Sequence, residues 1–157
     1  MSTTQTTVEP IQRSVTVNRS VEDAFRVFTE GISTWWPLHT HSIEAMTRGG
    51  VPTEAVLEPR EGGRLYERMS TGEDGYWGTI TTWEPPHRVV ISWKVNPEAP
   101  APTEIDVRFT EEGEATRVDL EHRGWERLGE KAAEARASYA DGWKSVLGAY
   151  AEVAGSS

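Results

Sequence analysis

The chain has 157 residues, enough for one domain that buries roughly two-thirds of the surface its unfolded chain exposes. Apolar residues make up 36% and charged residues 26%, a balance typical of globular rather than disordered or membrane proteins. The net charge of −9 argues against nucleic acid as a partner, because proteins that bind it present clustered basic faces. Cysteine is absent, which excludes disulfides, thiolate nucleophiles and cysteine-based zinc sites.

The first residues, MSTTQTTVEP, carry neither the basic nor the apolar stretch of a secretory signal. No apolar run approaches the ~20 residues that a membrane-spanning helix needs. We therefore expect a cytoplasmic protein with no membrane partner. Residues 1–10 are polar and are expected to form a flexible N-terminus, which leaves 11–154 as a single domain.

The N-terminal part predicts one strand followed by two short helices. In IQRSVTV (11–17), apolar and polar residues alternate, as in a half-buried strand. Ser20 is a good cap for a helix whose apolar residues recur at helical spacing. These residues are Val21, Ala24, Phe25 and Phe28. Gly31 ends this helix, and residues 32–36 fit a second short helix before Pro37.

From residue 38 to residue 122, turn signals such as Pro85-Pro86 and Glu112-Gly113 separate short strand-like segments. These segments are 52–58, 64–69, 76–83, 88–95, 103–110 and 115–122. Because short turns join consecutive strands, the pattern predicts an antiparallel meander. Residues 38–51 fit only an irregular strand or a loop.

The last thirty residues return to helical spacing. A helix from about residue 128 to residue 153 carries one apolar stripe. The stripe consists of Ala135, Tyr139, Gly142, Trp143, Val146, Leu147, Tyr150 and Val153. At 1.5 Å per residue, a helix of about 25 residues is nearly 40 Å long, so it needs a broad apolar surface to lie on. A curved antiparallel sheet supplies one.

This order of elements resembles the START/Bet v 1-like (SRPBCC) helix-grip domains, and among them the group related to the activator of Hsp90 ATPase. The matching segments are IQRSVTVNRSVEDAFRVFTEGISTWWP, GYWGTITTWEPPHRVVISW, RVDLEHRGWE and YADGWKSVLGAY. The resemblance implies an α+β fold in which a curved antiparallel sheet of six to seven strands wraps around a long C-terminal helix. Two short helices follow the first strand, and a cavity lies between sheet and helix.

Aromatic residues are expected to line that cavity. The alternation in 88–95 points Trp93 toward the long helix, whereas the alternation in 75–83 leaves the directions of Trp77 and Trp83 open. Gly78 suggests a bend or bulge nearby. The predicted ligand-binding residues are Trp36, His39, Trp77, Trp93, His122, Tyr139 and Trp143. The alternative is that these aromatic side chains are ordinary core packing.

Two polar residues on the predicted strands are candidates for chemistry. His122 lies on the inward-facing side of its strand, where it either donates a hydrogen bond, acts as an acid or base, or is a satisfied core residue. Glu67 and Arg68 face opposite ways, so at most one of them enters the cavity. A buried charge at either position needs a partner and is a natural anchor for a substrate.

His39 and His41 are two residues apart and form a possible metal clamp, with a third ligand from Glu44, Glu67 or His122. A polar pocket rim is the simpler interpretation, and we expect no metal.

The sequence leaves three functions open. The first is binding of a small hydrophobic ligand, lipid-like or aromatic, by a monomer or homodimer. The second, implied by the resemblance, is a cofactor-independent enzyme of the polyketide cyclase/aromatase or hydrolase/lyase type, with His122, Glu67 and His41 as candidate catalytic residues. The third is a chaperone partner like the Hsp90 activator. No nucleotide-binding loop occurs, so no cofactor is expected. No G-x-S-x-G motif occurs either, so Ser/His/Asp catalysis has no supporting signal.

Overall fold

The computed structural model describes residues 9–96 and 99–155, so residues 1–8 of the predicted flexible N-terminus lie outside them. The strands are β1 (Ile11–Val17), β2 (Glu54–Leu57), β3 (Arg64–Arg68), β4 (Asp74–Glu84), β5 (Arg88–Trp93), β6 (Thr103–Glu112) and β7 (Ala115–Arg123). The helices are α1 (Val21–Phe28), α2 (Ile32–Trp35), α3 (Ile43–Arg48), the 3-10 helix η1 (Trp125–Lys131) and α4 (Ala132–Ala154).

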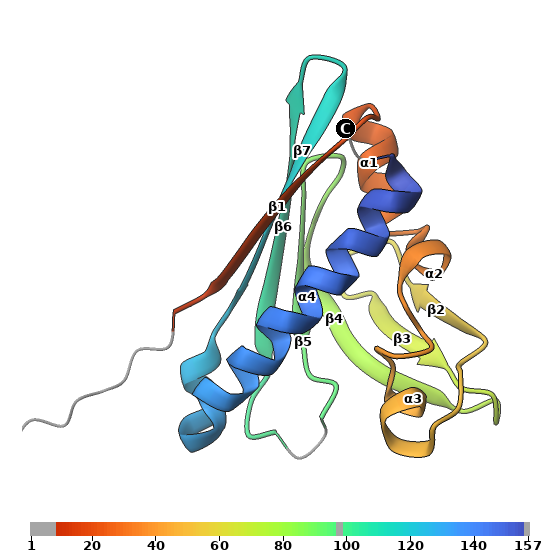
Figure 1. The fold of residues 1–157 in the computed structure, drawn as a ribbon, viewed down its shortest axis with the longest axis vertical. Coiled ribbons are helices and arrows are strands. Elements are labelled where there is room, and N and C mark those ends of the chain that lie inside the picture. The colour runs from red at the N-terminus through yellow and green to blue at the C-terminus, as the bar shows by residue number, and fades with distance from the viewer. Residues whose placement is uncertain (1–8, 97–98, 156–157) are drawn as a thin grey trace, which may run out of the picture.

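The seven strands form one antiparallel sheet in the order β1-β7-β6-β5-β4-β3-β2. Figure 1 shows the sheet curving around α4, which crosses it diagonally and ends beside α1. The strands β2 to β6 each pair with the next strand along the chain. The last strand, β7, also pairs with the first, β1. The predicted helix-grip fold, with two short helices after the first strand, is confirmed.

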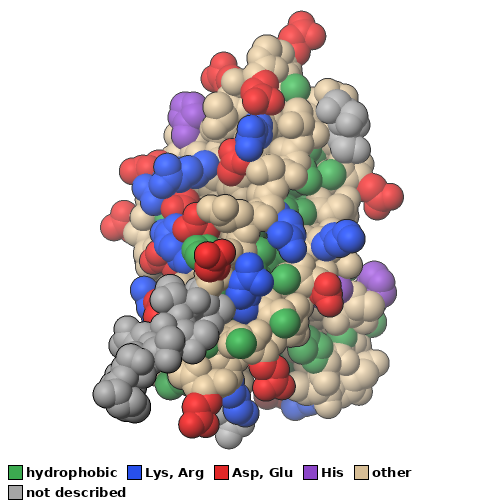
Figure 2. Space-filling view, turned by 60° about the vertical axis from the view of Figure 1, so that its left-hand side comes forward, with side chains coloured by type: hydrophobic (Ala, Val, Ile, Leu, Met, Phe, Trp, Pro, Cys, Tyr) green, Lys and Arg blue, Asp and Glu red, His purple; other side chains and the backbone are tan. Residues whose placement is uncertain are grey.

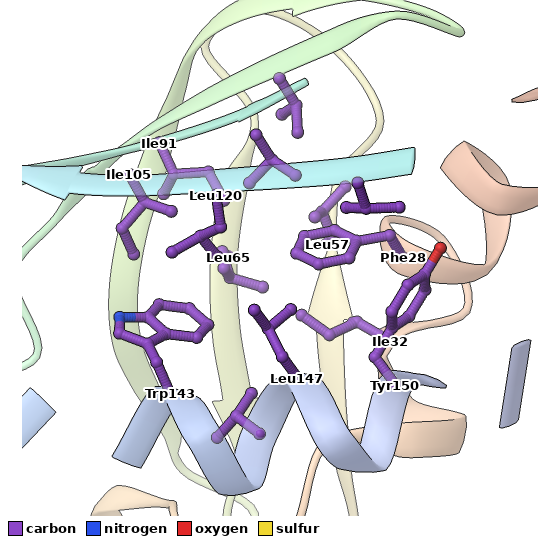
Figure 3. Packing of buried hydrophobic residues seen from close by; sticks show 14 of the residues in the cluster. Phe28, Ile32, Leu57, Leu65, Ile91, Ile105, Leu120, Trp143, Leu147 and Tyr150 are labelled. Carbon is purple, nitrogen blue, oxygen red and sulfur yellow. The ribbon is translucent and has the colours of Figure 1, made fainter. Parts of the chain in front are cut away.

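The core lies between α4 and the concave face of the sheet. Trp143, Leu147 and Tyr150 project from α4 toward the strands, as Figure 3 shows. The Tyr150 hydroxyl is also buried and donates to the carbonyl oxygen of Ala24 on α1, at 2.8 Å. Burying each large apolar side chain contributes about 1.5–3 kcal/mol, so this stripe holds the helix against the sheet.

The long helix differs from its prediction at both ends. The start of the predicted helix belongs instead to the 3-10 helix η1. Gly129, inside η1, adopts a φ of 62° and a ψ of −129°, a non-helical conformation suited to glycine that interrupts the helix there. At the other end, the predicted stripe residue Val153 is 42% exposed and Ala154 is buried instead. The period of 3.6 residues explains this shift, since Ala154 lies eleven residues, close to three full turns, after Trp143.

The prediction of an irregular strand or loop over residues 38–51 was wrong, because α3 lies within it. Ser42 caps this helix by accepting a hydrogen bond from the backbone N–H of Ala45, and Gly49 ends it at a φ of 71°. The helix has only six residues, too few for a periodic pattern to show. Its first turn is instead held by the side chain of Glu67, which comes from β3.

Two register shifts in β4 decide where its tryptophans point. Between the pairs Leu65–Gly78 and Tyr66–Tyr76, the extra residue is Trp77, which is buried. A second shift falls between Ile80 and Thr82, after which Trp83 faces inward. Trp83 then packs edge-on against Phe25 of α1, with ring centroids 5.1 Å apart. The sharper curvature expected around Gly78 is thus present as bulges.

The outer face of the sheet carries many charged side chains. Asp106 is 3% exposed and accepts hydrogen bonds from Arg88 at 2.9 Å and Arg123 at 3.0 Å. Burial raises the pKa of Asp106, but hydrogen bonds from the arginines outweigh it and hold the pKa below its usual value. Figure 2 shows acidic and basic side chains interspersed over one side of the molecule.

Candidate functional site

Four of the predicted ligand-binding residues meet beneath the sheet. The Trp36 ring centroid lies 4.9 Å from that of Trp77, 6.0 Å from that of Trp93 and 5.9 Å from that of Trp143. Each indole N–H has an acceptor, as buried indoles require. The acceptors are the carbonyl oxygen of His41, Glu67 Oε1, Tyr139 Oη and His122 Nδ1. These tryptophans therefore form a cluster whose polar atoms are all satisfied within the protein.

Glu67 is fully buried and is the anchor of α3. Its Oε1 accepts from the backbone N–H of Ile43 at 2.6 Å and from the indole of Trp77 at 2.7 Å. Its Oε2 accepts from the backbone N–H of Glu44 at 2.9 Å. Arg68, its neighbour, is exposed and pairs with Glu54 at 2.7 Å, so only Glu67 enters the interior. The carboxylate stabilises the fold through partners that already occupy both of its oxygens.

His122 is fully buried on β7, and its protonation is defined by its neighbours. The Nε1–H of Trp143 donates to Nδ1 at 3.0 Å, and Nε2 lies 2.7 Å from the hydroxyl of Thr103. Because an indole can only donate, Nδ1 must be unprotonated and the single proton of the neutral ring is on Nε2. Burial lowers the pKa of His122 to about 3, which keeps the ring neutral near pH 7.

Tyr139, on α4, is a further polar residue hydrogen-bonded to the tryptophan cluster. Its hydroxyl accepts the indole N–H of Trp93 at 3.0 Å, and its ring lies 5.5 Å from that of Trp125. Burial raises the pKa of Tyr139, although the hydrogen bond from Trp93 opposes this, so the phenol stays protonated at neutral pH. Within the described residues, no hydrogen bond takes up the phenol proton.

A hollow of about 560 Å³ opens beside these residues, between the β5–β6 connection and the η1–α4 junction. We call it the Trp93–Tyr139 hollow. Residues that line it include Trp93, Lys94, Thr103, Trp125, Lys131 and Tyr139. Its volume falls within the range of small-molecule sites, roughly 300–1,000 Å³. Its lining combines the aromatic residues Trp93, Trp125 and Tyr139 with aliphatic and polar residues.

The structure separates the predicted site residues into groups. Trp93 and Tyr139 line the hollow, and Trp36, Trp77 and Trp143 belong to the tryptophan cluster behind Trp93. His122 is connected to the hollow through Thr103. His39 is exposed, and His41 is half-buried with its Nδ1 2.7 Å from the Thr40 hydroxyl.

Sequence reasoning predicted only Trp93 and Tyr139 among the residues that line the hollow, and the residues it missed include Lys94, Thr103, Trp125 and Lys131. For Thr103 a signal existed, because it alternates inward with Ile105 and Val107 and is paired in register with Trp93. Lys94 and Lys131 lie 37 positions apart in the sequence, the first directly after β5 and the second at the end of η1, so no periodic pattern connects them.

The candidate metal clamp is not assembled. Glu44 binds the backbone N–H and the hydroxyl of Ser70, and these hydrogen bonds lower its pKa. Glu67 and His122 are held by the partners described above. Across residues 9–96 and 99–155, no group of three or more histidine, aspartate or glutamate side chains is placed to hold a metal ion. None of the helices in that part of the chain combines the length and apolarity needed to span a bilayer.

Both the sequence and the fold of this chain resemble those of known proteins. Residues 18–155 match the model of the family described as activator of Hsp90 ATPase homolog 1-like protein. A search of curated proteins found no match.

Two solved structures are 30% identical in sequence. The anthrahydroquino-γ-pyrone synthase Txn09 aligns over 94% of this chain and 97% of its own, with a TM-score of 0.62. The self-sacrificing resistance protein CalC from Micromonospora echinospora aligns over 92% of each chain, with a TM-score of 0.65. A Bacillus halodurans protein shares the fold at 16% identity, over 96% of this chain and 99% of its own, with a TM-score of 0.65. The chain therefore belongs to the activator of Hsp90 ATPase homolog 1-like family.

Proposed function

We propose that this protein binds a small aromatic molecule in the Trp93–Tyr139 hollow. The observation that carries the proposal is a hollow of ligand size walled by Trp93, Trp125 and Tyr139. Planar rings stack on or against such side chains, which contributes about 0.5–1.5 kcal/mol per ring pair beyond the area buried. The tryptophan cluster behind these walls keeps them in place, because its indole N–H groups are all satisfied.

The comparisons favour an aromatic over a lipid-like ligand. The name of the 30% identical synthase refers to an anthrahydroquino-γ-pyrone, a fused-ring compound. The likeness covers nearly the whole of both chains, so it includes the region of the hollow. A fused-ring ligand also suits the flat walls better than a flexible acyl chain, which gains nothing from ring stacking.

The same likeness favours catalysis as a second candidate function, without a cofactor. In this alternative, the groups that face a substrate are the hydroxyls of Thr103 and Tyr139. His122 and Glu67 act at most through other residues, because their polar atoms are already hydrogen-bonded within the protein. The chaperone alternative rests on the family name alone.

The proposal is tested by titrating the protein with a neutral fused-ring probe, methyl anthraquinone-2-carboxylate, and following binding by calorimetry. We expect saturable one-to-one binding that Tyr139→Leu weakens about three- to ten-fold, the worth of one ring contact. The matched control is Tyr76→Leu, since Tyr76 is 44% exposed on β4 and does not line the hollow. An absence of saturable binding, or equal weakening by both variants, would contradict the proposal.

A further inference from the structure

The hydroxyl of Thr103 is a hydrogen-bond donor available to a ligand. Since His122 carries its proton on Nε2, that nitrogen donates to Thr103 Oγ1, and the hydroxyl proton must point elsewhere. The other hydrogen-bonding contact of the hydroxyl is to the carbonyl oxygen of Trp93, at a long 3.5 Å. An oxygen atom of a ligand in the hollow therefore competes well for this proton.

The hydroxyl of Tyr139 is likewise a hydrogen-bond donor available to a ligand. It accepts the indole N–H of Trp93, so its own proton is free for a further acceptor. Both residues line the hollow, and each hydroxyl accepts a hydrogen bond from a neighbour, which leaves its own proton to donate. The residues that line the hollow thus include two hydrogen-bond donors for a ligand.

Positive charge is concentrated around the same hollow. The chain has only three lysines, and two of them, Lys94 and Lys131, line it; among the described residues the acidic one in the lining is Glu130. None of the ion pairs formed within residues 9–96 and 99–155 involves Lys94 or Lys131. In a protein with a net charge of −9, which repels anions in general, two ammonium groups that form no ion pair with the described residues create a local exception.

Resting on the function proposed above, we infer that the hollow selects aromatic molecules that carry an anionic oxygen, a carboxylate or an ionised phenol. The rings contact Trp93 and Tyr139, which retain exposed surface. The oxygen accepts charge-assisted hydrogen bonds from the lysines and further hydrogen bonds from the available hydroxyls. A charge-assisted hydrogen bond is roughly twice as strong as a neutral one, so the anion gains more from this donor set than a neutral analogue of the same shape does.

The test compares anthraquinone-2-carboxylate with its methyl ester, by calorimetry at pH 7.5. We expect the carboxylate to bind about ten-fold more tightly, the effect of one charge-assisted hydrogen bond. In the double variant Lys94→Met/Lys131→Met, the affinity for the carboxylate should fall about ten-fold, to that of the ester, whose own affinity stays within two-fold. The matched control is Lys144→Met, because Lys144 is exposed on α4 outside the hollow and its loss should alter neither affinity.

The outcomes separate this inference from the function on which it rests. If ester and carboxylate bind equally, or if Lys144→Met weakens the carboxylate as much as the double variant does, the selection for an anion is refuted while the aromatic site stands. If neither compound binds, the proposed function fails and the inference fails with it. Each single lysine variant is measured as well, so that a folding defect in the double variant, visible by circular dichroism, does not hide the result.

Discussion

The buried histidine makes a quantitative prediction about acid stability. In the folded protein the pKa of His122 is about 3, whereas the ordinary value is 6.5. Between these two pH values the unfolded chain takes up a proton that the folded protein does not. His122 therefore supports stability fully above pH 6.5, and this support is lost progressively as the pH falls toward 3.

The size of the effect follows from the same two values. At pH 4.5 the unfolded histidine is two pH units below its pKa, and each unit corresponds to about 1.36 kcal/mol. Lowering the pH from 7.5 to 4.5 should thus cost roughly 3 kcal/mol of unfolding free energy through this one residue. The figure is large beside the 5–15 kcal/mol that typically holds a domain together.

The perturbation is His122→Gln, whose side chain can accept from the Trp143 indole and donate to Thr103 without titrating. Urea unfolding at pH 7.5 and pH 4.5 gives the loss of stability for each protein. Carboxylates titrate in both proteins and largely cancel in the comparison, so the variant should lose roughly 3 kcal/mol less than the wild type. The control is His39→Gln, at an exposed position. If wild type and His122→Gln lose the same amount within 1 kcal/mol, the reasoning is refuted.

Two further predictions concern the scaffold of the site. Glu67→Gln places an amide group opposite backbone and indole N–H donors, so we expect urea unfolding to show a loss of about 2–3 kcal/mol and faster hydrogen exchange at the α3 amides. Gly78→Ala should cost about 1–3 kcal/mol in the same assay, because its Cβ would press on the carbonyl oxygen of Ser92 and lie 2.9 Å from Cγ2 of Ile91.

Matched substitutions make both predictions specific. Glu54→Gln removes an exposed carboxylate that pairs with Arg68 and should cost no more than about 1 kcal/mol. Gly148→Ala meets no atom within 4 Å and lies within α4, so it should stabilise the protein by about 0.5–1 kcal/mol. A Glu67→Gln cost no greater than that of Glu54→Gln would contradict the anchoring role of Glu67. A neutral Gly78→Ala would contradict the tight approach of β4 to β5.

The site was only partly predictable from the sequence. The inward direction of Trp93 followed from simple alternation and was correct, and Tyr139 was expected to face the same interior. The directions of Trp77 and Trp83 did not follow, because each depends on a bulge, and one extra residue turns the following side chains to the opposite face of the strand. The role of Thr103 as a donor depends on its hydrogen bond with His122, which the sequence does not reveal.

The order and type of most elements were determined by the sequence itself. Alternation and helical spacing are local patterns, and the turns between strands are set by residues next to one another, so the meander and the long helix could be predicted. Tertiary structure alone decided the rest. The helix α3 depends on Glu67, which lies 24 positions after Ile43, and the proton of His122 depends on Trp143, 21 positions later. Such partners come into contact only when the sheet curves around the helix, and no pattern within a short stretch of sequence predicts that contact.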